Sequence, residues 1–387
     1  MTYQKTHSWI TFHLDLHNAP PQLWMALGEA KSKCDHIAGV PLRPNTARDL
    51  HQVYLAKGVQ ATTAIEGNTL SLDEVRQRIE NVKSLPPSKE YLGQEIDNVL
   101  DACNWIKDEL RKSKNATIEI NTALIKKYNS FVLNKLDIDG GVVPGEIRAH
   151  EVGVGKYKAP DAKHCEELTR KMCEWINGPD FISSDDQRIV YGLIKAIVAH
   201  VYIAWVHPFG DGNGRTARLL EFQILLENGV PAPAAQLLSN HYNQTRAKYY
   251  RELDKTSKSG GDLIPFIQYA VQGFVDGLCE QLAFIRMQQL DVAWLNYIHQ
   301  SFLDQKTTVK RRRKQLAYDL RKVTEEVPLS KITDISPAVA RLYASKKELT
   351  LRRDLDDLVK KGIIEKTEKG YRSKPETILA FLPFRKL

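Results

Sequence analysis

The chain has 387 residues, with 55 Lys and Arg against 47 Asp and Glu, a formal net charge of +8 and 42% hydrophobic residues. These values are ordinary for a soluble protein of two or three domains. No apolar run approaches the roughly 18 residues that a membrane span needs. The first residues lack the basic segment and the apolar segment that make up a secretory signal. Five cysteines without a C-x-x-C pair indicate a reducing compartment and no structural zinc, so we expect a cytoplasmic protein that binds no membrane.

The first third of the chain predicts helices separated by short turns. They are expected over residues 21–34, 45–66, 94–111 and 118–133. Gly67 is the expected C-cap of the second helix, and Ser71 with Glu74 forms a capping box that begins another. Glu66 then stands at a helix C-terminus, where the helix dipole disfavours a carboxylate by roughly 0.3–1 kcal/mol. We therefore expect a cationic partner for Glu66.

The middle of the chain changes character before it becomes helical again. Residues 140–162 alternate glycine with β-branched residues between prolines, which predicts a β-hairpin. Helices are expected over 162–177 and 184–206, and the second is apolar nearly all round, as a buried helix would be. His200 lies within it, and we interpret it as a core histidine with satisfied hydrogen bonds rather than a ligand.

A glycine-rich loop then leads into a helix at residues 207–218, which read HPFGDGNGRTAR. A helix N-terminus offers free backbone N–H groups to an anion, and Arg215 and Arg218, one turn apart, add paired donors suited to phosphate. The Asp211 carboxylate would repel a phosphate without a metal ion, but it could bind a Mg²⁺ ion that also binds the phosphate. His207 is placed to take a proton from a nucleophile. The stretch predicts phosphoryl or nucleotidyl transfer from a Mg²⁺-nucleotide, and it is not a P-loop.

The same stretch resembles the motif H-x-F-x-[DE]-G-N-G-R-x-x-R of the Fic family. Every fixed position matches: His207, Phe209, Asp211, Gly212, Asn213, Gly214, Arg215 and Arg218. Fic proteins typically transfer AMP from ATP to a hydroxyl of a target protein, so the resemblance implies His207 as the base and Asp211 as the Mg²⁺ ligand. Nucleotide contacts are implied for Gly212, Asn213, Gly214, Arg215, Thr216, Ala217 and Arg218. Glycine at 214, where the kinase relative Doc has lysine, favours nucleotidyl transfer.

The resemblance also implies an inhibitory segment ahead of the catalytic motif. Thr62 to Gly67, TTAIEG, is similar to the inhibitory motif [ST]-x-x-x-E-[GN] of Fic proteins. In those proteins the glutamate pairs with the second motif arginine and blocks productive placement of the γ-phosphate. The implied inhibitory residues are therefore Thr62, Glu66 and Gly67, with Arg218 as the partner of Glu66.

Two further parts of the site are implied by the same resemblance. The hairpin at 140–162 resembles the Fic flap, whose edge pairs with the target segment as an added strand. Its nucleotide contacts would be Val152, Gly153, Val154 and Gly155, and Arg148 and Pro160 match recurrent family positions. A helix over 239–256 carries Tyr249 and Tyr250, which match a tyrosine pair near the adenine.

The basic excess of the chain belongs to its C-terminal region alone. Residues 287–387 hold 22 Lys and Arg against 13 Asp and Glu, a net +9, which leaves −1 for the remainder. Helices over 311–324, 336–343 and 345–362, then a hairpin over 363–382, resemble a winged helix. If this region binds DNA, the candidate contacts are Lys346, Lys347, Arg352 and Arg353. Asp354, Asp356 and Asp357 on the same helix would repel phosphate.

These observations predict a mainly α-helical protein: a Fic helical fold with a β-hairpin flap, followed by a winged helix-turn-helix domain. We expect an N-terminal region with the inhibitory helix over 1–110, a Fic catalytic core over 111–285 and a winged helix over 290–387. The expected function is Mg²⁺-dependent AMP transfer from ATP to a Tyr, Thr or Ser hydroxyl of a target protein, restrained by Glu66. Removal of AMP from a target, DNA-binding regulation by a nucleotide-sensing Fic core, and transfer of UMP or phosphocholine stay open. A homodimer is expected by analogy with the family.

Overall fold

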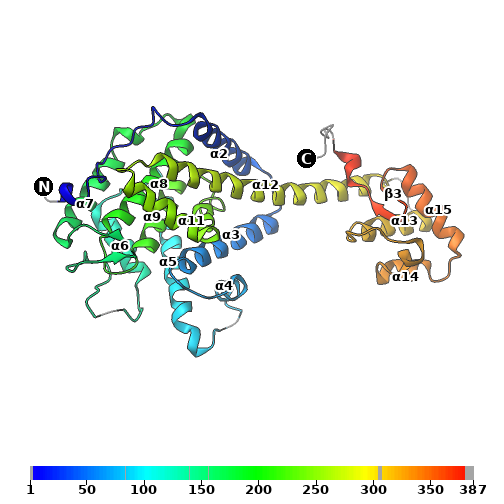
Figure 1. Cartoon of the computed structure of the whole chain (residues 1–387). Helices are drawn as coiled ribbons and strands as arrows, with labels where there is room; N and C mark the ends of the chain where they lie inside the picture. Colours follow the sequence, from blue (N-terminus) through cyan, green and yellow to red (C-terminus); the bar gives the residue numbers. More distant parts are fainter. Residues whose placement is uncertain (1–2, 83, 139, 156, 304–306, 380–387) are drawn as a thin grey trace. The chain divides into compact units, whose positions relative to one another are not determined.

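The computed structural model describes residues 3–82, 84–138, 140–155, 157–303 and 307–379. Residue 156 of the predicted flap and residues 380–382 of the predicted wing lie outside these ranges. The chain divides into two compact units, Met1–Leu282 and Ala283–Leu387, which are coloured blue to yellow-green and yellow to red in Figure 1. The boundary falls inside one continuous helix, α12 (Ile264–Gln300), and not in a linker.

Unit 1 is almost wholly helical, which confirms the predicted fold class. Besides the first part of α12, its helices are α1 (Tyr3–Thr6), α2 (Pro21–Gly39), α3 (Pro44–Ala64), α4 (Leu72–Ile79), α5 (Glu90–Lys112), α6 (Thr122–Val132), α7 (Ala162–Ile176), α8 (Arg188–Val206), α9 (Asn213–Glu227), α10 (Leu237–Gln244) and α11 (Arg246–Lys258). Short 3₁₀ turns lie at Pro87–Lys89, Pro179–Phe181 and Asp185–Gln187. Two antiparallel strands, β1 (Gly153–Val154) and β2 (Tyr157–Lys158), make a small hairpin.

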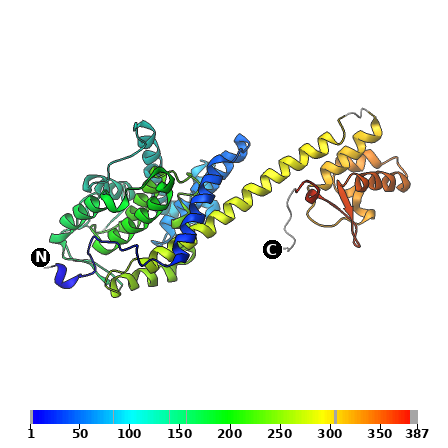
Figure 2. The ribbon, with the colours of Figure 1, turned by 90° about the horizontal axis from the view of Figure 1, so that it is seen from above.

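Helix α8 lies at the centre of unit 1 and packs along α9 (Figures 1 and 2). Its side chains are buried on all sides, which explains why its sequence is apolar nearly all round. The expectation that no apolar run approaches the length of a membrane span is wrong. By length and composition alone, residues 185–206 form a helix that could cross a membrane. However, 78% of its apolar window is buried inside the protein, as in the core helix of a globular domain.

The helix that carries the predicted inhibitory segment ends two residues earlier than the sequence predicted, and its C-cap is Ile65 and not Gly67. Helix α3 ends at Ala64 with Ile65 as its C-cap, so Glu66 and Gly67 lie in the following turn. The backbone of Gly67 has φ +110°, which other residues rarely adopt. The capping box is confirmed, because the Ser71 side chain accepts from the Glu74 N–H and the Glu74 carboxylate accepts from the Ser71 N–H.

Two other predicted elements differ in extent. The helix expected over 239–256 is broken at Thr245, whose hydroxyl bonds back to the carbonyl of His241 and separates α10 from α11. The flap expected over 140–162 has regular pairing only in β1 and β2, and residues 140–150 form turns and bends. Other groups therefore have to hold these residues in place.

Unit 2 has the predicted order of elements. After the end of α12 come α13 (Thr308–Leu320), a 3₁₀ turn (Leu329–Asp334), α14 (Pro337–Tyr343), α15 (Glu348–Lys360) and an antiparallel pair, β3 (Ile364–Lys366) and β4 (Tyr371–Ser373), followed by a 3₁₀ turn (Pro375–Ile378). Figure 2 shows these elements in orange and red. Their apolar side chains share one core, which includes Trp294, Leu316, Leu320, Val339, Leu355, Leu358, Ile364 and Tyr371. The assignment as a winged helix stays a prediction.

A buried carboxylate joins α13 to α15 within unit 2. Asp354 is 1% exposed and accepts from Arg312 Nε and Arg313 Nε, both at 2.7 Å, and from the Tyr343 hydroxyl at 2.8 Å. Arg313 also lies 3.0 Å from Asp357. Asp354 and Asp357 are therefore paired internally with arginines, and the expectation that the aspartates of this helix repel phosphate stays a prediction.

Candidate functional site

The loop between α8 and α9 carries the predicted catalytic motif in a strained, well-supported shape. His207 ends α8 in the left-handed region, with φ 46° and ψ 59°. Gly212 begins α9 with φ +77°, and a Cβ at this position would lie 3.0 Å from Asn129 and Val132. Glycine is therefore required at 212 both by the backbone conformation and by the close approach of α6.

Two asparagines hold this loop. The Asn213 side chain accepts from the Phe209 N–H at 3.0 Å and donates to the Phe209 carbonyl at 2.8 Å. Asn129, fully buried on α6, donates to the carbonyl of Asp211 and accepts from the N–H of Gly145. Because both ends of the Asn213 amide are engaged within the loop, its side chain shapes the anion site, and its predicted nucleotide contact stays a prediction.

Arg148 fastens the flap to the catalytic loop. It is 5% exposed and donates from Nε to the His207 carbonyl at 2.8 Å, from Nη1 to the His150 carbonyl at 2.7 Å and from Nη2 to the Pro160 carbonyl at 2.5 Å. Its own N–H donates to the carbonyl of Pro208. One side chain thus replaces the strand pairing that most of the flap lacks.

Each motif arginine meets a carboxylate from the N-terminal helices. Arg218, 2% exposed, donates from Nη2 to Glu66 Oε1 at 2.5 Å and to the Thr62 carbonyl at 2.8 Å. The cationic partner expected for Glu66 is therefore Arg218, and Thr62 takes part through its backbone. Arg215, 4% exposed, lies 2.9 Å from Glu95 and 3.2 Å from Asp211.

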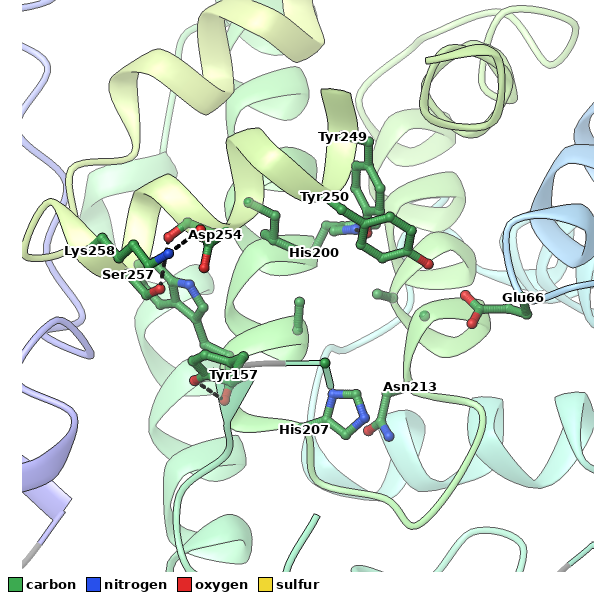
Figure 3. Close-up of a pocket in the computed structure, with 16 residues that line it drawn as sticks. Glu66, Tyr157, His200, His207, Asn213, Tyr249, Tyr250, Asp254, Ser257 and Lys258 are labelled. Atoms are coloured by element: carbon green, nitrogen blue, oxygen red, sulfur yellow. Dashed lines mark hydrogen bonds and ion pairs between the residues drawn. The ribbon is translucent and has the colours of Figure 1, made fainter. Parts of the chain in front are cut away.

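Glu66, His207 and Asn213 line a cavity of about 570 Å³ (Figure 3), whereas Arg215, Arg218, Asp211 and Glu95 are not among its lining residues. Its lining comes from the turn after α3, the flap, α8 and the loop that follows it, α9 and α11: Glu66, Gly155, Tyr157, His200, Ala204, Trp205, His207, Asn213, Gly214, Ala217, Tyr249, Tyr250, Leu253, Asp254, Ser257 and Lys258. Glu66 lies at one end beside Gly214, and the Asp254–Lys258 ion pair lies at the other.

The predicted nucleotide residues divide into those that reach this cavity and those that do not. Of the flap residues, Gly155 lines it, whereas Val152 and Gly153 are not among its lining residues; the side chain of Val154 lies outside what the structure describes. Thr216 is fully buried within α9. Tyr249 and Tyr250 both line the cavity, but they differ in exposure, at 3% and 38%.

Tyr249 belongs to a buried polar network behind the cavity wall. Its hydroxyl lies 2.8 Å from His200 Nε2, and His200 Nδ1 lies 3.0 Å from Glu221. Tyr242 donates to the other oxygen of Glu221 at 3.0 Å and stacks on the Tyr249 ring. His200 is thus fully buried with polar partners, as expected, and it is also one of the residues that line the cavity.

The electrostatics of the site favour a neutral histidine and an ionised glutamate. Burial, helped by the charge of Arg148, lowers the pKa of His207 to about 4, although a hydrogen bond with the Ala204 backbone and the charges of Glu66 and Asp211 act in the opposite direction. Burial opposes the charge on Glu66, but Arg218, with help from Arg215 and His207, outweighs it and lowers the pKa of Glu66. At neutral pH His207 can accept a proton and Glu66 carries its charge.

The metal candidate is a single carboxylate. The Asp211 side chain is 47% exposed, so it keeps lone pairs free although it contacts Arg215 and the Gly212 N–H. Among the described residues, no three His, Cys, Asp or Glu side chains are grouped to hold a metal ion. One carboxylate fits Mg²⁺ in a nucleotide site, where phosphates and water supply the other ligands.

Three positions that matter to this geometry were not predicted. Glu95 is one of many acidic residues on an amphipathic helix, and Asn68 and Asn129 are ordinary polar residues in the sequence. Each contacts a residue distant along the chain: 27 positions separate Asn68 from Glu95, 82 separate Asn129 from Asp211, and 120 separate Glu95 from Arg215. No local pattern marks such partners.

Comparison with known proteins agrees with this geometry. The family model described as Fic/DOC family matches residues 111–225. Protein adenylyltransferase fic-1 of Caenorhabditis briggsae is 32% identical over 214 residues, which are 55% of this chain and 38% of that protein. The chain spans less than half the length of the curated relatives it matches.

Solved structures show the same fold. A Fic family protein from Desulfovibrio desulfuricans G20 superposes with a TM-score of 0.58 at 20% identity, over 93% of this chain and 98% of that one. Fic-1 from C. elegans (residues 134–508) gives a TM-score of 0.55 at 26% identity, over 68% and 73%. The matched segment 111–225 contains the whole loop from His207 to Arg218. Residues 111–225 are thus similar to the Fic/DOC family, and the fold is that of solved Fic family proteins.

Proposed function

We propose that this chain transfers AMP from ATP to a Tyr, Thr or Ser hydroxyl of a target protein, in a Mg²⁺-dependent reaction restrained by Glu66. The support is a neutral buried His207 beside a helix N-terminus that carries two buried arginines. The names of relatives that share the domain, protein adenylyltransferases, point to the same reaction.

In this reaction His207 accepts the proton of the target hydroxyl as its oxygen bonds to the α-phosphorus. The bond from the α-phosphorus to the oxygen that bridges to the β-phosphorus breaks, and pyrophosphate leaves. Arg215, Arg218 and the first N–H groups of α9 stabilise the charge that gathers on the leaving group. A positioned base contributes roughly 10²–10⁴-fold to such a step.

Asp211 is the residue that would hold Mg²⁺, which would supply positive charge to the phosphates of the bound nucleotide. Arg215 contacts both oxygens of Asp211 in this structure and would be close enough to the same nucleotide to bind phosphate. The dependence of the reaction on Mg²⁺ and on Asp211 belongs to the same proposal.

The observation that carries the proposal is the position of Glu66. Its carboxylate lies against the first turn of α9, where a Cβ at Gly214 would clash with it, and it holds Arg218. This is the place where the γ-phosphate would need the arginine. Glu66 therefore occupies the anion site with the protein's own carboxylate, and ATP must displace it to bind productively.

The experiment follows label from α-³²P-ATP onto protein, with Mg²⁺ or with EDTA. We expect little label on the wild type, strong label on Glu66→Gly and none on Glu66→Gly combined with His207→Ala. Glu74→Gln, in the capping box of α4, is the matched control that changes a nearby carboxylate outside the cavity. Label that survives loss of His207 would overturn the assignment of the base, and equal label on wild type and Glu66→Gly would remove Glu66 as inhibitor.

One observation favours AMP removal as a second candidate. Glu66 and His207 line the same cavity, so the carboxylate that blocks ATP could also orient a water molecule toward a bound AMP-protein bond. Release of label from a pre-modified target by wild type, but not by Glu66→Gly, would support this candidate. Loss of label that is equal in both proteins would exclude it.

DNA binding by unit 2 is a separate candidate. Lys346, Lys347, Arg352 and Arg353 are exposed, whereas Arg312 and Arg313 are engaged by Asp354. If the exposed cations contact phosphate, the affinity of the full chain for duplex DNA should fall steeply with salt. Lys346→Gln with Lys347→Gln should weaken it; unchanged affinity would count against this surface.

A further inference from the structure

Glu95 holds the first motif arginine in the same way that Glu66 holds the second. Its Oε1 accepts from Arg215 Nη1 at 2.9 Å, and Arg215 Nη2 lies 3.2 Å from Asp211. Glu95 comes from α5, which lies outside the motif and outside the inhibitory turn. In this state both arginines of the anion site are therefore engaged by carboxylates of the protein.

Asn68 connects the two carboxylate contacts. Its Nδ2 donates to Glu95 Oε2 at 2.7 Å and to the Leu92 carbonyl at 2.9 Å, and the side chain is buried. The N–H groups of Glu66 and Asn68 both donate to the Thr63 carbonyl, at 3.0 and 3.2 Å. The turn after α3 thus places Glu66 in contact with Arg218. Two residues later it places Asn68 in contact with Glu95, the carboxylate that binds Arg215.

We propose that Glu95 is a second internal competitor of the nucleotide, which engages Arg215 and is coupled through Asn68 to the release of Glu66. The proposal rests on the proposed nucleotide site and adds a regulatory contact to it. Phosphate can take Arg215 only when Glu95 gives it up, and Asn68 makes that release easier once the turn that carries Glu66 has moved.

The charges of the site agree with this role. Three carboxylates, on Glu66, Glu95 and Asp211, face the two arginines, so these five groups sum to −1 before a nucleotide enters. Removing the charge of Glu66 or Glu95 brings the sum to zero, and removing both brings it to +1. Each removal of a negative charge favours the binding of a triphosphate, because buried opposite charges interact more strongly than exposed ones.

The test measures binding of α,β-methylene-ATP with Mg²⁺ to the full chain by isothermal titration calorimetry. This analogue cannot transfer AMP, so affinity is read without turnover. Glu95→Gln should bind the analogue about tenfold more tightly than wild type. This is the effect expected when one charged hydrogen bond to Arg215 no longer competes with the nucleotide. Asp97→Asn, on the same helix and paired with Arg78, removes the same charge away from the cavity and should leave the affinity unchanged.

The coupling is measured by a double-mutant cycle. If Asn68 links the two contacts, Glu95→Gln should increase the affinity for the analogue less in the Glu66→Gly background than in wild type. Equal increases in affinity would overturn the coupling. Glu95→Asp provides a second variant that keeps the charge but shortens the reach, and it should also bind more tightly. Thermal unfolding of each variant reports whether it is folded.

The outcomes separate this inference from the proposed function. If Glu66→Gly binds the analogue but Glu95→Gln and Glu95→Asp bind it no better than wild type, Glu95 is not a competitor, and the proposed transfer still stands. If both Glu95 variants bind it more weakly, Glu95 instead positions Arg215 for phosphate. If Glu66→Gly binds no nucleotide at all, both proposals are overturned.

Discussion

Arg148 Nε lies 2.8 Å from the carbonyl oxygen of His207, so a hydrogen bond joins the flap to the histidine that we propose as the base. The same guanidinium reaches the carbonyls of His150 and Pro160. A single buried cation therefore sets the left-handed backbone of His207 and the path of the flap together. Movement of the flap and reorientation of the histidine should be linked for this reason.

The first prediction concerns this link. Arg148→Ala would leave three carbonyl oxygens without their charged donor, at a cost on the order of 3 kcal/mol in stability. It should also abolish labelling in the Glu66→Gly background, because His207 loses its support. Thermal unfolding and the α-³²P-ATP assay check this, with Arg170→Ala as the control, since Arg170 is an exposed residue of α7 that pairs with Glu174. Full labelling by the Arg148 variant would show that the clamp is dispensable.

The second prediction tests the brace across the catalytic loop. Asn213→Asp keeps the shape of the side chain, but an ionised carboxylate cannot donate to the Phe209 carbonyl and is repelled by it. We expect labelling in the Glu66→Gly background to fall at least about tenfold, with a loss of roughly 1–3 kcal/mol in stability. Asn104→Asp, on the exposed face of α5, is the matched control. Equal labelling by the two variants would contradict the role of Asn213 as a brace.

The parts of the site that follow from local chemistry could be predicted from the sequence. Gly212 and the arginines after it mark an anion-binding helix start, and Ser71 with Glu74 marks a helix start by the spacing alone. The pairing of Glu66 with Arg218 is different, because 152 positions separate them. It was reached by resemblance to a family motif, and the residues themselves indicated only that Glu66 needed a cation.

The remaining features depend on packing between distant segments. Nothing near Glu95 indicates that α5 will bring it to Arg215, and nothing near Arg148 indicates three carbonyl partners. The break at Thr245 reflects competition between a side-chain hydroxyl and the backbone, which a helix-favouring sequence conceals. In unit 2, Asp354 looked like an exposed acidic residue because the sequence does not show that Arg312 and Arg313 cover it.

The third prediction concerns pH. Burial lowers the pKa of His207 to about 4, and because Glu66 raises it, the pKa in Glu66→Gly should be lower still. The labelling rate of that variant at saturating ATP should therefore change little between pH 8 and 6, where an ordinary histidine with a pKa near ~6.5 would lose most of its basic form. A rate that halves near pH 6.5 would contradict a buried neutral base.

The same shift has a consequence for stability. Because the pKa of His207 is lower in the folded chain than in the unfolded chain, the unfolded state binds the extra proton first. The stability of unit 1 should fall as the pH drops below about 6.5 and reach its full loss near the folded value. Unfolding must be measured at each pH, so that acid unfolding is not mistaken for protonation of the base.

The fourth prediction compares two aspartates of α15 that are two residues apart. Asp354 is buried between Arg312, Arg313 and Tyr343, whereas Asp356 is exposed. Asp354→Asn removes a charge from a buried pair and should destabilise unit 2 by about 3–5 kcal/mol. Asp356→Asn should change stability by no more than about 0.5 kcal/mol. Hydrogen–deuterium exchange of α13 and α15 in the full chain measures the difference.

Both variants remove one negative charge from the same helix, so their net charges are identical and a difference between them reports the pairing of Asp354. The pH dependence gives an independent check. Burial opposes the charge on Asp354, but the two arginines and Tyr343 outweigh it and lower its pKa. Its stabilising effect is therefore complete above the unfolded value of about 3.9 and is lost as the pH falls through the lower folded value. Equal protection of α13 and α15 in both variants at neutral pH would show that the buried pair does not stabilise unit 2.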